Sequence, residues 1–501
     1  MSYSASSMVA IVGIATLVSY LIIDRVRGHS RLKHIPGPFL AGWTDFWMLS
    51  AQLSGRMCFI LAEANEKYAG PIAKIAPGWV VCGDGDELRG IWGVRSAWQR
   101  SPWYRGFRFD PHKDNVFSTH DDQAHERLRS KLMPGYGGKD VDDLHDQIDK
   151  QVAGLVSLLE TKYLSTDTDF RPVDLARKVQ YFTLDVISAL AFGKELGYLA
   201  ADQDLHGYIK TTESTLPIML ATALVPWFMY TLQSPRLKWL IPNVRSIVGI
   251  GTVVGVAYDA VSERYGDKPL VKRDMLGSFV RHGLTKEEAE GETVVQIIAG
   301  SDTSATAIRS TFLFIITNPR VYRRLQAEID DGVRAGRISS PITDAEAREL
   351  PYLQAVIREG LRMWPPATAV LPKVSNTDQI VCGVRIPAGT NVAWAPFSFL
   401  RSKKTFGEDA NVFRPERWLQ HVNSDPARHR LMDQTVMMEF ASGSRWECLG
   451  KTVAQIELNK TYVELLRRFD FALVDPTNPW SSYNAAVFIQ RDMNVVVTRR
   501  S

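Results

Sequence analysis

Hydrophobic positions along this chain recur mainly at helical spacing, with a few short segments of strand character between the helical runs. The longest helical run opens at the capping box Thr285-Lys286-Glu287-Glu288 and extends to about Thr317, just before a proline. We expect further helices at 46–68, 122–132, 144–159, 173–192, 353–363 and after residue 450, and strands at 72–83, 369–373, 379–386 and 391–394. The pattern predicts a mainly α fold with small β-sheets.

The N-terminal residues differ from the rest of the chain. Met8–Ile23 is uncharged and mostly apolar, and the uncharged Ser2–Ser7 extends it toward the ~20 residues that a membrane span needs. Basic residues follow this run and none precedes it, which places the body in the cytosol. The alternatives are a cleaved signal peptide, which has the opposite charge order, and a poorly ordered tail.

Three parts of the chain follow from these patterns. We predict a single-pass membrane anchor over residues 1–24 and a stiff, basic hinge over residues 25–45, because Ile35-Pro36-Gly37-Pro38 interrupts any continuing helix. Residues 46–501 contain no linker, charge block or repeat, so we predict one large domain there.

Composition narrows the class of protein. The hydrophobic share of 45% and the charged share of 23% are those of a globular chain, and a net charge of +4 is too small to indicate nucleic-acid binding. With only four cysteines and no C-x-x-C pair, the chain lacks the pattern of a disulfide framework or a cysteine-based zinc site, and a reducing compartment fits best. The cysteines are Cys58, Cys82, Cys382 and Cys448.

Candidate chemistry gathers in the stretch Phe440–Gly450, FASGSRWECLG. Gly443 and Gly450 allow backbone conformations closed to other residues and close approach to a flat ligand, and Arg445 offers a forked cation to a carboxylate. The helix that follows favours the thiolate form of Cys448. A thiolate with these neighbours indicates a haem iron ligand and its propionate partner. A buried structural cysteine is the alternative.

Two other polar sets stand out on helices. Ala299–Ser304 places a glycine and an acid in the middle of the longest helix, where glycine costs about 1 kcal/mol relative to alanine. Either Asp302 and Thr303 face a ligand in a widened groove, or this is a kinked packing site. His125 and Arg129 lie four residues apart on one helix face, so they could hold one acidic group or form a solvated surface.

Two apolar segments have an open role. Residues 98–120 are irregular and rich in aromatic side chains, which either bind a ligand or pack onto the body. Residues 215–232 are almost wholly apolar but contain Pro217 and Pro226, so we expect core and membrane-touching surface there rather than a second span. No glycine motif of the dinucleotide-binding kind follows a strand, which argues against a nicotinamide or flavin site.

Taken in order, these pieces resemble the cytochrome P450 superfamily of haem-thiolate monooxygenases over nearly the whole chain. The IPGPF hinge resembles the family's hinge, and AGSDTS resembles its oxygen-activating groove. Glu359 and Arg362 match the E-x-x-R pair, and Pro415–Trp418 resembles the segment whose arginine joins that pair. Each motif alone is weak, but their order before a cysteine loop is specific. The chain is most similar in style to the pisatin-demethylase-like fungal group.

The resemblance implies a role for each matching residue. Cys448 would be the axial ligand of haem b, and Asp302 and Thr303 would relay protons. Glu359, Arg362 and Arg417 would form a buried structural cluster. The residues implied to hold the haem propionates are Arg445, Arg129, His125 and Lys373.

The cysteine loop departs from the family pattern. The family has F-x-x-G-x-R-x-C-x-G, with one residue between arginine and cysteine, whereas Trp446 and Glu447 both separate Arg445 from Cys448 here. Aligned on the cysteine, Trp446 occupies the position of the arginine. The role of Arg445 is therefore the part of the resemblance that this shift puts in question.

The implied activity is oxidation of a lipophilic small molecule with dioxygen and NADPH through a separate reductase, with cytochrome b5 as a further partner. The implied setting is the endoplasmic reticulum membrane and fungal secondary-metabolite biosynthesis. Substrate contacts are expected from 103–117, 294–301, 367–371 and 486–488. The alternatives are detoxification of a plant or xenobiotic compound, a haem-thiolate isomerase or dehydratase, and a non-catalytic haem binder. Five basic residues on the expected haem side either dock an acidic partner or are solvated: Arg127, Arg129, Lys131, Arg445 and Lys451.

Overall fold

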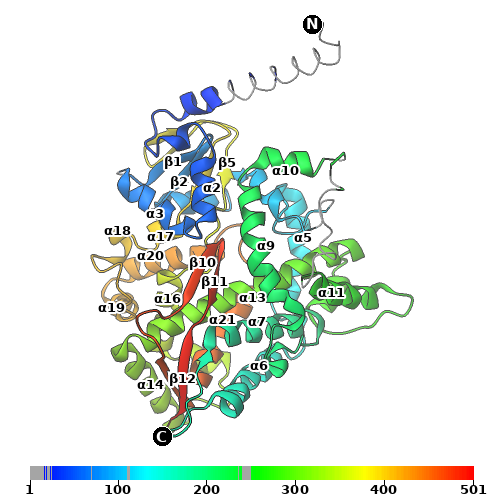
Figure 1. Cartoon of the computed structure of the whole chain (residues 1–501), viewed down its shortest axis with the longest axis vertical. Helices are drawn as coiled ribbons and strands as arrows, with labels where there is room; N and C mark the ends of the chain where they lie inside the picture. Colours follow the sequence, from blue (N-terminus) through cyan, green and yellow to red (C-terminus); the bar gives the residue numbers. More distant parts are fainter. Residues whose placement is uncertain are drawn as a thin grey trace, which may run out of the picture.

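The computed structural model describes residues 25–68, 70–109, 113–234, 236–237, 239 and 250–500, together with Thr16, Ser19 and Ile23. Within these residues the chain is mainly helical with small sheets, and the long helix α13 (Lys286–Ile316) runs through its middle (Figure 1). The other helices are α2 (Phe46–Leu53), α3 (Met57–Lys67), α4 (Gly85–Trp92), α5 (Asp122–Tyr136), α6 (Leu144–Leu158), α7 (Leu175–Phe192), α8 (Tyr198–Ala201), α9 (Tyr208–Ala223), α10 (Pro226–Leu232), α11 (Ile250–Tyr265), α12 (Met275–Arg281), α14 (Pro319–Arg334), α15 (Asp344–Arg348), α16 (Pro351–Met363), α17 (Pro396–Phe399), α18 (Lys403–Phe406), α19 (Glu416–Ser424), α20 (Pro426–Met437) and α21 (Lys451–Leu466).

Four small sheets accompany the helices. The largest has the order β1-β2-β8-β5-β3, in which β2 and β8 are parallel and the other pairs antiparallel. Its strands are β1 (Ile72–Ala76), β2 (Trp79–Cys82), β8 (Asn391–Trp394), β5 (Lys373–Val374) and β3 (Gln99–Arg100). The others are β6 (Gln379–Val381) with β7 (Val384–Ile386), β10 (Ser481–Ala485) with β11 (Val487–Arg491), and β4 (Val173–Asp174), β12 (Asn494–Arg499) and β9 (Phe469–Leu473).

The helix α13 is the centre of the core. It begins at the predicted capping box, where Thr285 and Glu288 exchange side-chain and backbone hydrogen bonds. Helices α7, α11, α16 and α21 and strand β11 pack around it, so most of its residues are buried. A Cβ at Gly300 would lie 2.7 Å from side-chain atoms of Ile187 on α7. The helix is unbroken, and Gly300 therefore serves close packing rather than a break in the helix.

Several predicted elements are confirmed and others are wrong. The two strands at 72–83 and the helix after residue 450 are present, whereas the single strand expected at 379–386 is a hairpin of two short strands. The single helix expected at 46–68 is two helices, because Gly55 has φ 69° between them. The strand expected at 369–373 is reduced to β5, since Leu371 has φ 33° and leaves the extended conformation.

The expected hinge packs onto the body. Lys74 N donates to Pro36 O at 2.8 Å, and the rings of His29 and Trp43 stack with centroids 3.9 Å apart. No helix within the described residues is both long enough and apolar enough to cross a bilayer. The predicted anchor, Met8–Ile23, lies almost wholly outside the described residues.

Candidate active site

The loop before α21 presents the sulfur of Cys448. Its backbone N–H donates to Phe440 O at 2.8 Å, which closes the loop on itself. Cys448 is exposed, yet burial raises the pKa of its thiol, although the amides of Gly450 and Lys451 act in the opposite direction. A sulfur can be both accessible and surrounded by protein when it faces an internal space, and we infer that Cys448 does so. The amides at the start of α21 lower this pKa as predicted, but burial outweighs them, so a cation bound at the sulfur would favour the thiolate.

The two loop glycines have different roles. Gly443 has φ 78°, in the left-handed region, and a Cβ there would meet nothing within 4 Å, so its conformation alone favours glycine. Gly450 has φ −78°, which any residue adopts, and a Cβ there would lie 3.9 Å from Cys448 Sγ. The expectation of a glycine-only conformation is thus wrong for Gly450, whose place beside the sulfur favours a small residue.

One side of α13 is open in the middle of the core. Ala299 is exposed and Thr303, one turn later, is half-buried, while most residues around them are buried. The hydroxyl of Thr303 donates to Ala299 O at 2.8 Å. Because α13 packs against α21, which follows Cys448, we infer that this apolar side and the sulfur line one internal space.

Asp302 lies on the part of α13 that contacts α7. Its Oδ1 accepts from Gln180 Nε2, and Gln180 Oε1 accepts from Arg309 at 3.3 Å. The other oxygen, Oδ2, is buried without a hydrogen-bond partner. Burial raises the pKa of Asp302 to about 6, although Arg309 lowers it. This carboxyl can therefore take up or release a proton near neutral pH, next to Thr303.

Three basic side chains lie against the buried ring of Trp446, and a fourth, Arg129, holds the adjacent Glu447. We call the four the cation cluster: Arg100, His125, Arg129 and Lys373. The guanidinium of Arg100 lies 3.8 Å from the Trp446 centroid, the His125 ring 3.8 Å and the Lys373 ammonium 4.9 Å. Arg129 donates to Glu447 O and so joins α5 to the cysteine loop.

The cation cluster has more positive charge than this chain compensates. Burial lowers the pKa of Lys373 to about 6, and burial with the surrounding cations lowers the pKa of His125 to about 2. His125 Nδ1 and Arg100 Nε are buried without a partner, and within the described residues the Lys373 ammonium contacts aromatic rings and makes no hydrogen bond. Buried donors of this kind need an anion. The cluster is therefore suited to carboxylates.

Arg445, the predicted companion of Cys448, lies to one side of this cluster. It donates to the Asp122 carboxylate and to Val94 O at 2.6 Å, and its side chain is about one-third exposed, 32%. Sequence reasoning missed Arg100, which lies in β3 and donates to Val116 O at 3.2 Å. The signal that could have identified Arg100 is a charged residue at the start of the aromatic segment 98–120.

Comparison with known proteins decides the family. The sequence model described as Cytochrome P450 matches residues 46–498. The chain belongs to the cytochrome P450 family. It is 40% identical to Cytochrome P450 monooxygenase ABA1 of Pyricularia oryzae over 499 residues, covering 98% of this chain and 96% of that protein. Identity is 38% to aba1 of Botryotinia fuckeliana over 93% and 92% of the two chains, and 36% to abl1 of Leptosphaeria maculans over 96% and 85%.

The residues of this cytochrome P450 monooxygenase fit the haem of its family. A single thiol faces an internal space, and unpaired buried cations lie beside its loop, as a cofactor with two carboxylates requires. When bound, haem supplies the dioxygen chemistry through its thiolate-ligated iron. The chain contributes the ligand, the counter-charges for the carboxylates and the apolar side of α13.

A second group, which we call the charge cluster, holds the scaffold of this P450: Glu359, Arg362 and Arg417. All three are buried. Glu359 accepts from Arg362 at 2.9 and 2.7 Å and from Arg417 at 2.9 Å, with Trp418 Nε1 at 3.0 Å. The remaining arginine donors reach carbonyl groups such as Leu400 O at 2.9 Å. The cluster joins α16 to the first turn of α19.

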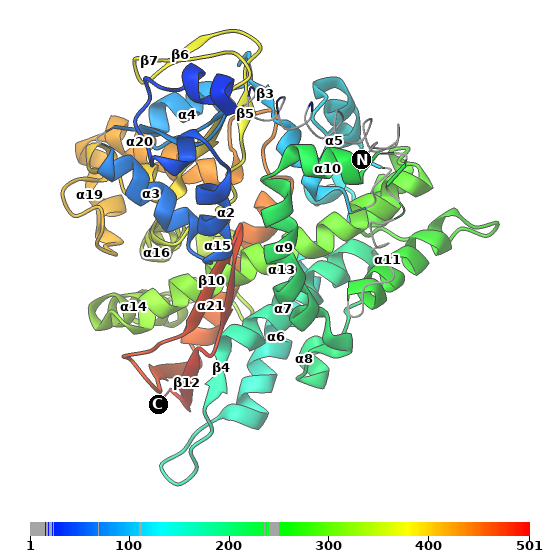
Figure 2. The same ribbon diagram turned by 45° about the horizontal axis from the view of Figure 1, so that its top comes forward.

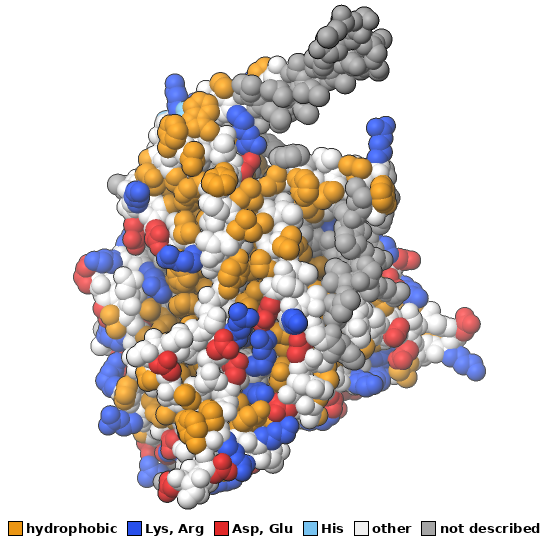
Figure 3. Space-filling model, viewed as in Figure 1, with side chains coloured by type: hydrophobic (Ala, Val, Ile, Leu, Met, Phe, Trp, Pro, Cys, Tyr) orange, Lys and Arg blue, Asp and Glu red, His pale blue; other side chains and the backbone are white. Residues whose placement is uncertain are grey.

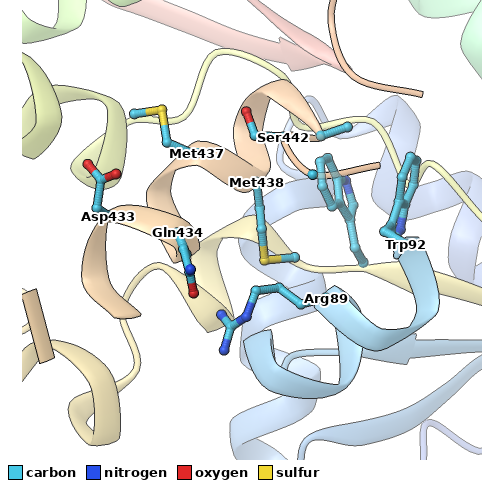
Figure 4. Close-up of a pocket in the computed structure, with 10 residues that line it drawn as sticks. Arg89, Trp92, Asp433, Gln434, Met437, Met438 and Ser442 are labelled. Atoms are coloured by element: carbon cyan, nitrogen blue, oxygen red, sulfur yellow. The ribbon is translucent and has the colours of Figure 1, made fainter. Parts of the chain in front are cut away.

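A cavity of about 410 Å³ lies beside the cysteine loop of the P450. Figure 4 shows Met437, Met438 and Ser442 from α20 and the loop on one side and Arg89 and Trp92 from α4 on the other. The cavity therefore separates the cysteine loop from α4.

Proposed function

We propose that this monooxygenase oxidises a lipophilic small molecule with dioxygen and electrons from NADPH, in fungal secondary metabolism. The supporting observation is the open apolar side of α13 at Ala299, next to the hydroxyl of Thr303 and near the loop of Cys448. An apolar space above a haem favours a substrate that gains by leaving water. The fungal origin of the relatives supports the metabolic setting.

Each residue of the site takes a role in this proposal. Cys448 ligates the iron through its thiolate. The cation cluster holds the two propionates, and Arg445 supports it indirectly by holding Asp122. Asp302 would hold a proton at Oδ2, and the hydroxyl of Thr303 would pass it to the open side of α13. Replacing Thr303 by Ala should keep electron use but release peroxide instead of product.

We propose that a reductase docks over the cavity beside the cysteine loop, where the surface lies near Cys448. The five basic residues considered above mostly pair within the chain: Arg127 and Lys131 with Glu288 at 2.8 and 2.9 Å, Lys451 with Glu447 at 2.9 Å, and Arg445 with Asp122. These pairs partly compensate the basic charges. Docking of the reductase therefore depends on the shape of the cavity as well as on charge. Cytochrome b5 is a candidate for the same face.

We propose the endoplasmic reticulum membrane as the location, with the catalytic domain in the cytosol. Large apolar residues are exposed near the start of the domain, with Phe39 at 81% and Phe46 at 65%. Figure 3 shows hydrophobic side chains gathered on the face that carries α2 and α9. Ile218 of α9 is also exposed. These side chains would enter the bilayer next to the predicted anchor.

Turnover with a reductase tests the proposal. Product formation from a lipophilic substrate should require both NADPH and dioxygen, and the reduced protein should bind carbon monoxide with the strongly red-shifted Soret band of thiolate ligation. Product formed without NADPH would instead favour an isomerase or dehydratase. A histidine-type carbon monoxide band would overturn the assignment of Cys448.

A further inference from the structure

Two of the four cysteines meet far from Cys448. Cys82 ends β2, and Cys382 is the first residue of the two-residue turn between β6 and β7. Both are free thiols, and the Cys382 side chain is close enough to the Cys82 thiol to raise the pKa of that thiol. Chain segments distant in sequence therefore bring the two thiols close together.

Backbone contacts hold the pair together independently of the sulfurs. Cys382 N donates to Glu87 Oε1 at 3.0 Å, and Glu87 N donates to Asp84 Oδ1 at 3.0 Å. The Cys82 thiol donates to Asp84 O, with the atoms 3.9 Å apart. Figure 2 shows the β6–β7 hairpin next to α4. Both cysteines are thus tied to the first turn of α4.

The position of Cys382 is unfavourable for its backbone. Cys382 has φ 51° and Gly383 has φ 75°, so two successive residues are left-handed, as in the tight hairpin turn that favours Asn-Gly or Asp-Gly. A cysteine in this conformation is strained and gains nothing from the turn. Strain of this kind at a reactive side chain is a reason to look for a function of that side chain.

We propose that Cys82 and Cys382 form a redox-active thiol pair that a low-molecular-weight disulfide, such as glutathione disulfide, converts into a reversible disulfide bond. Cys382 is half-buried and Cys82 is buried, so the reagent reaches Cys382 first. Contact with Cys382 and burial raise the pKa of the Cys82 thiol, which also makes Cys82 the second thiol to react.

The exchange balances in two steps. The Cys382 thiolate attacks one sulfur of glutathione disulfide, whose S–S bond breaks, and the released glutathione thiolate takes up the proton that Cys382 lost. Cys82 then attacks Cys382 Sγ, loses its own proton and displaces the second glutathione. Two protein thiols are oxidised to one disulfide, and one glutathione disulfide is reduced to two glutathione molecules.

The bond would tie the β6–β7 hairpin to the end of β2, next to the first turn of α4. Helix α4 forms one side of the cavity beside the cysteine loop. Cys82 is paired in register with Trp394 of β8, and Trp394 stacks on Trp92 with ring centroids 5.4 Å apart. Trp92 and Arg89, at the other end of α4, line that cavity (Figure 4). The pair would therefore restrain α4 from its first turn.

The test uses the full-length haem protein in buffers of defined glutathione to glutathione disulfide ratio. Free thiols are trapped with N-ethylmaleimide, and peptides are mapped by mass spectrometry. The expected product is a Cys82–Cys382 peptide pair, lighter by two hydrogen atoms and restored by dithiothreitol. Cys382 remaining as a glutathione adduct, with Cys82 still alkylated after denaturation, would overturn the proposal.

Matched variants separate the pair from general thiol reactivity. Cys82→Ser should stop the reaction at the glutathione adduct of Cys382, and Cys382→Asn, which suits the left-handed turn, should remove the link and keep the carbon monoxide spectrum. Cys58→Ser changes a buried, separate cysteine and should leave the yield of the link unchanged. Amide hydrogen exchange at the β6–β7 hairpin should slow on oxidation of the parent protein alone, and equal exchange in both states would refute the tether.

Discussion

The charge cluster and the cation cluster are both buried, but the chain compensates only the first. Glu359 lies between Arg362 and Arg417, and every nitrogen of both guanidinium groups has a partner. In the cation cluster, His125 Nδ1 and Arg100 Nε have none. Since buried polar groups are normally satisfied, compensated charge is part of the scaffold and uncompensated charge marks a binding site.

The largest test of this contrast removes one member of the charge cluster. Arg362→Ala leaves Glu359 buried with one cation fewer, so the free energy of unfolding should fall by about 3–5 kcal/mol and the protein should accumulate without haem. Urea denaturation and the haem-to-protein absorbance ratio measure both effects. On the same helix, Arg358→Ala removes only a partly exposed pair with Asp433, and should cost about 1 kcal/mol or less. Equal losses would contradict the scaffold role.

Asp302 lies between these two cases of compensated and uncompensated groups, because its Oδ1 is paired with Gln180 and its Oδ2 has no partner. Burial raises its pKa from 3.8 to about 6, so its contribution to stability is full below about pH 4 and is lost as the pH rises through about 6. Asp302→Asn removes this dependence. The difference in free energy of unfolding between the variant and the parent should therefore shift in favour of the variant, by up to about 3 kcal/mol, from about pH 4 to about pH 7. A difference that does not change with pH would be inconsistent with a protonated carboxyl.

Two buried lysines test the cation cluster directly. Lys373 makes cation–π contacts with Trp92 at 4.4 Å and with Trp446, whereas Lys460 pairs with Asp149 at 2.6 Å. A hydrogen bond to a charged group contributes about 1.5–3 kcal/mol, so Lys373→Met should speed haem release by about tenfold to hundredfold. Haem transfer to excess apomyoglobin measures this rate. Lys460→Met should reduce stability and leave the rate of haem release unchanged. Faster haem release from Lys460→Met than from Lys373→Met would contradict the assignment of Lys373 to the binding site.

The smallest effects concern the cysteine loop between the clusters. Gly443→Ala forces a left-handed residue with a side chain and should cost about 1–2 kcal/mol. Gly450→Ala keeps an ordinary conformation with its Cβ in contact with the sulfur, and should stay within about 0.5 kcal/mol. Thermal unfolding of both variants measures the difference. Similar costs would contradict the conclusion that conformation selects Gly443.

Local signals predicted much of the fold. The capping box at Thr285 set the start of α13, and the strand pattern at 72–83 placed β1 and β2, because both signals lie within a few residues. The helix expected at 46–68 was wrong since apolar spacing continues across Gly55, while the backbone turns there. The role of Gly300 could not be read from the sequence, because only the packed helices show that Ile187 occupies the space of a side chain there.

Residue types at short and ordered spacings were enough to predict the family, the cysteine that the site is built around and the three members of the charge cluster. The packed fold was needed to show which cations lie against Trp446, that Arg445 is paired with Asp122, and that Cys82 lies near Cys382. Those contacts join residues far apart in the chain. Burial and charge compensation at such contacts depend on every neighbour at once, which no local spacing records.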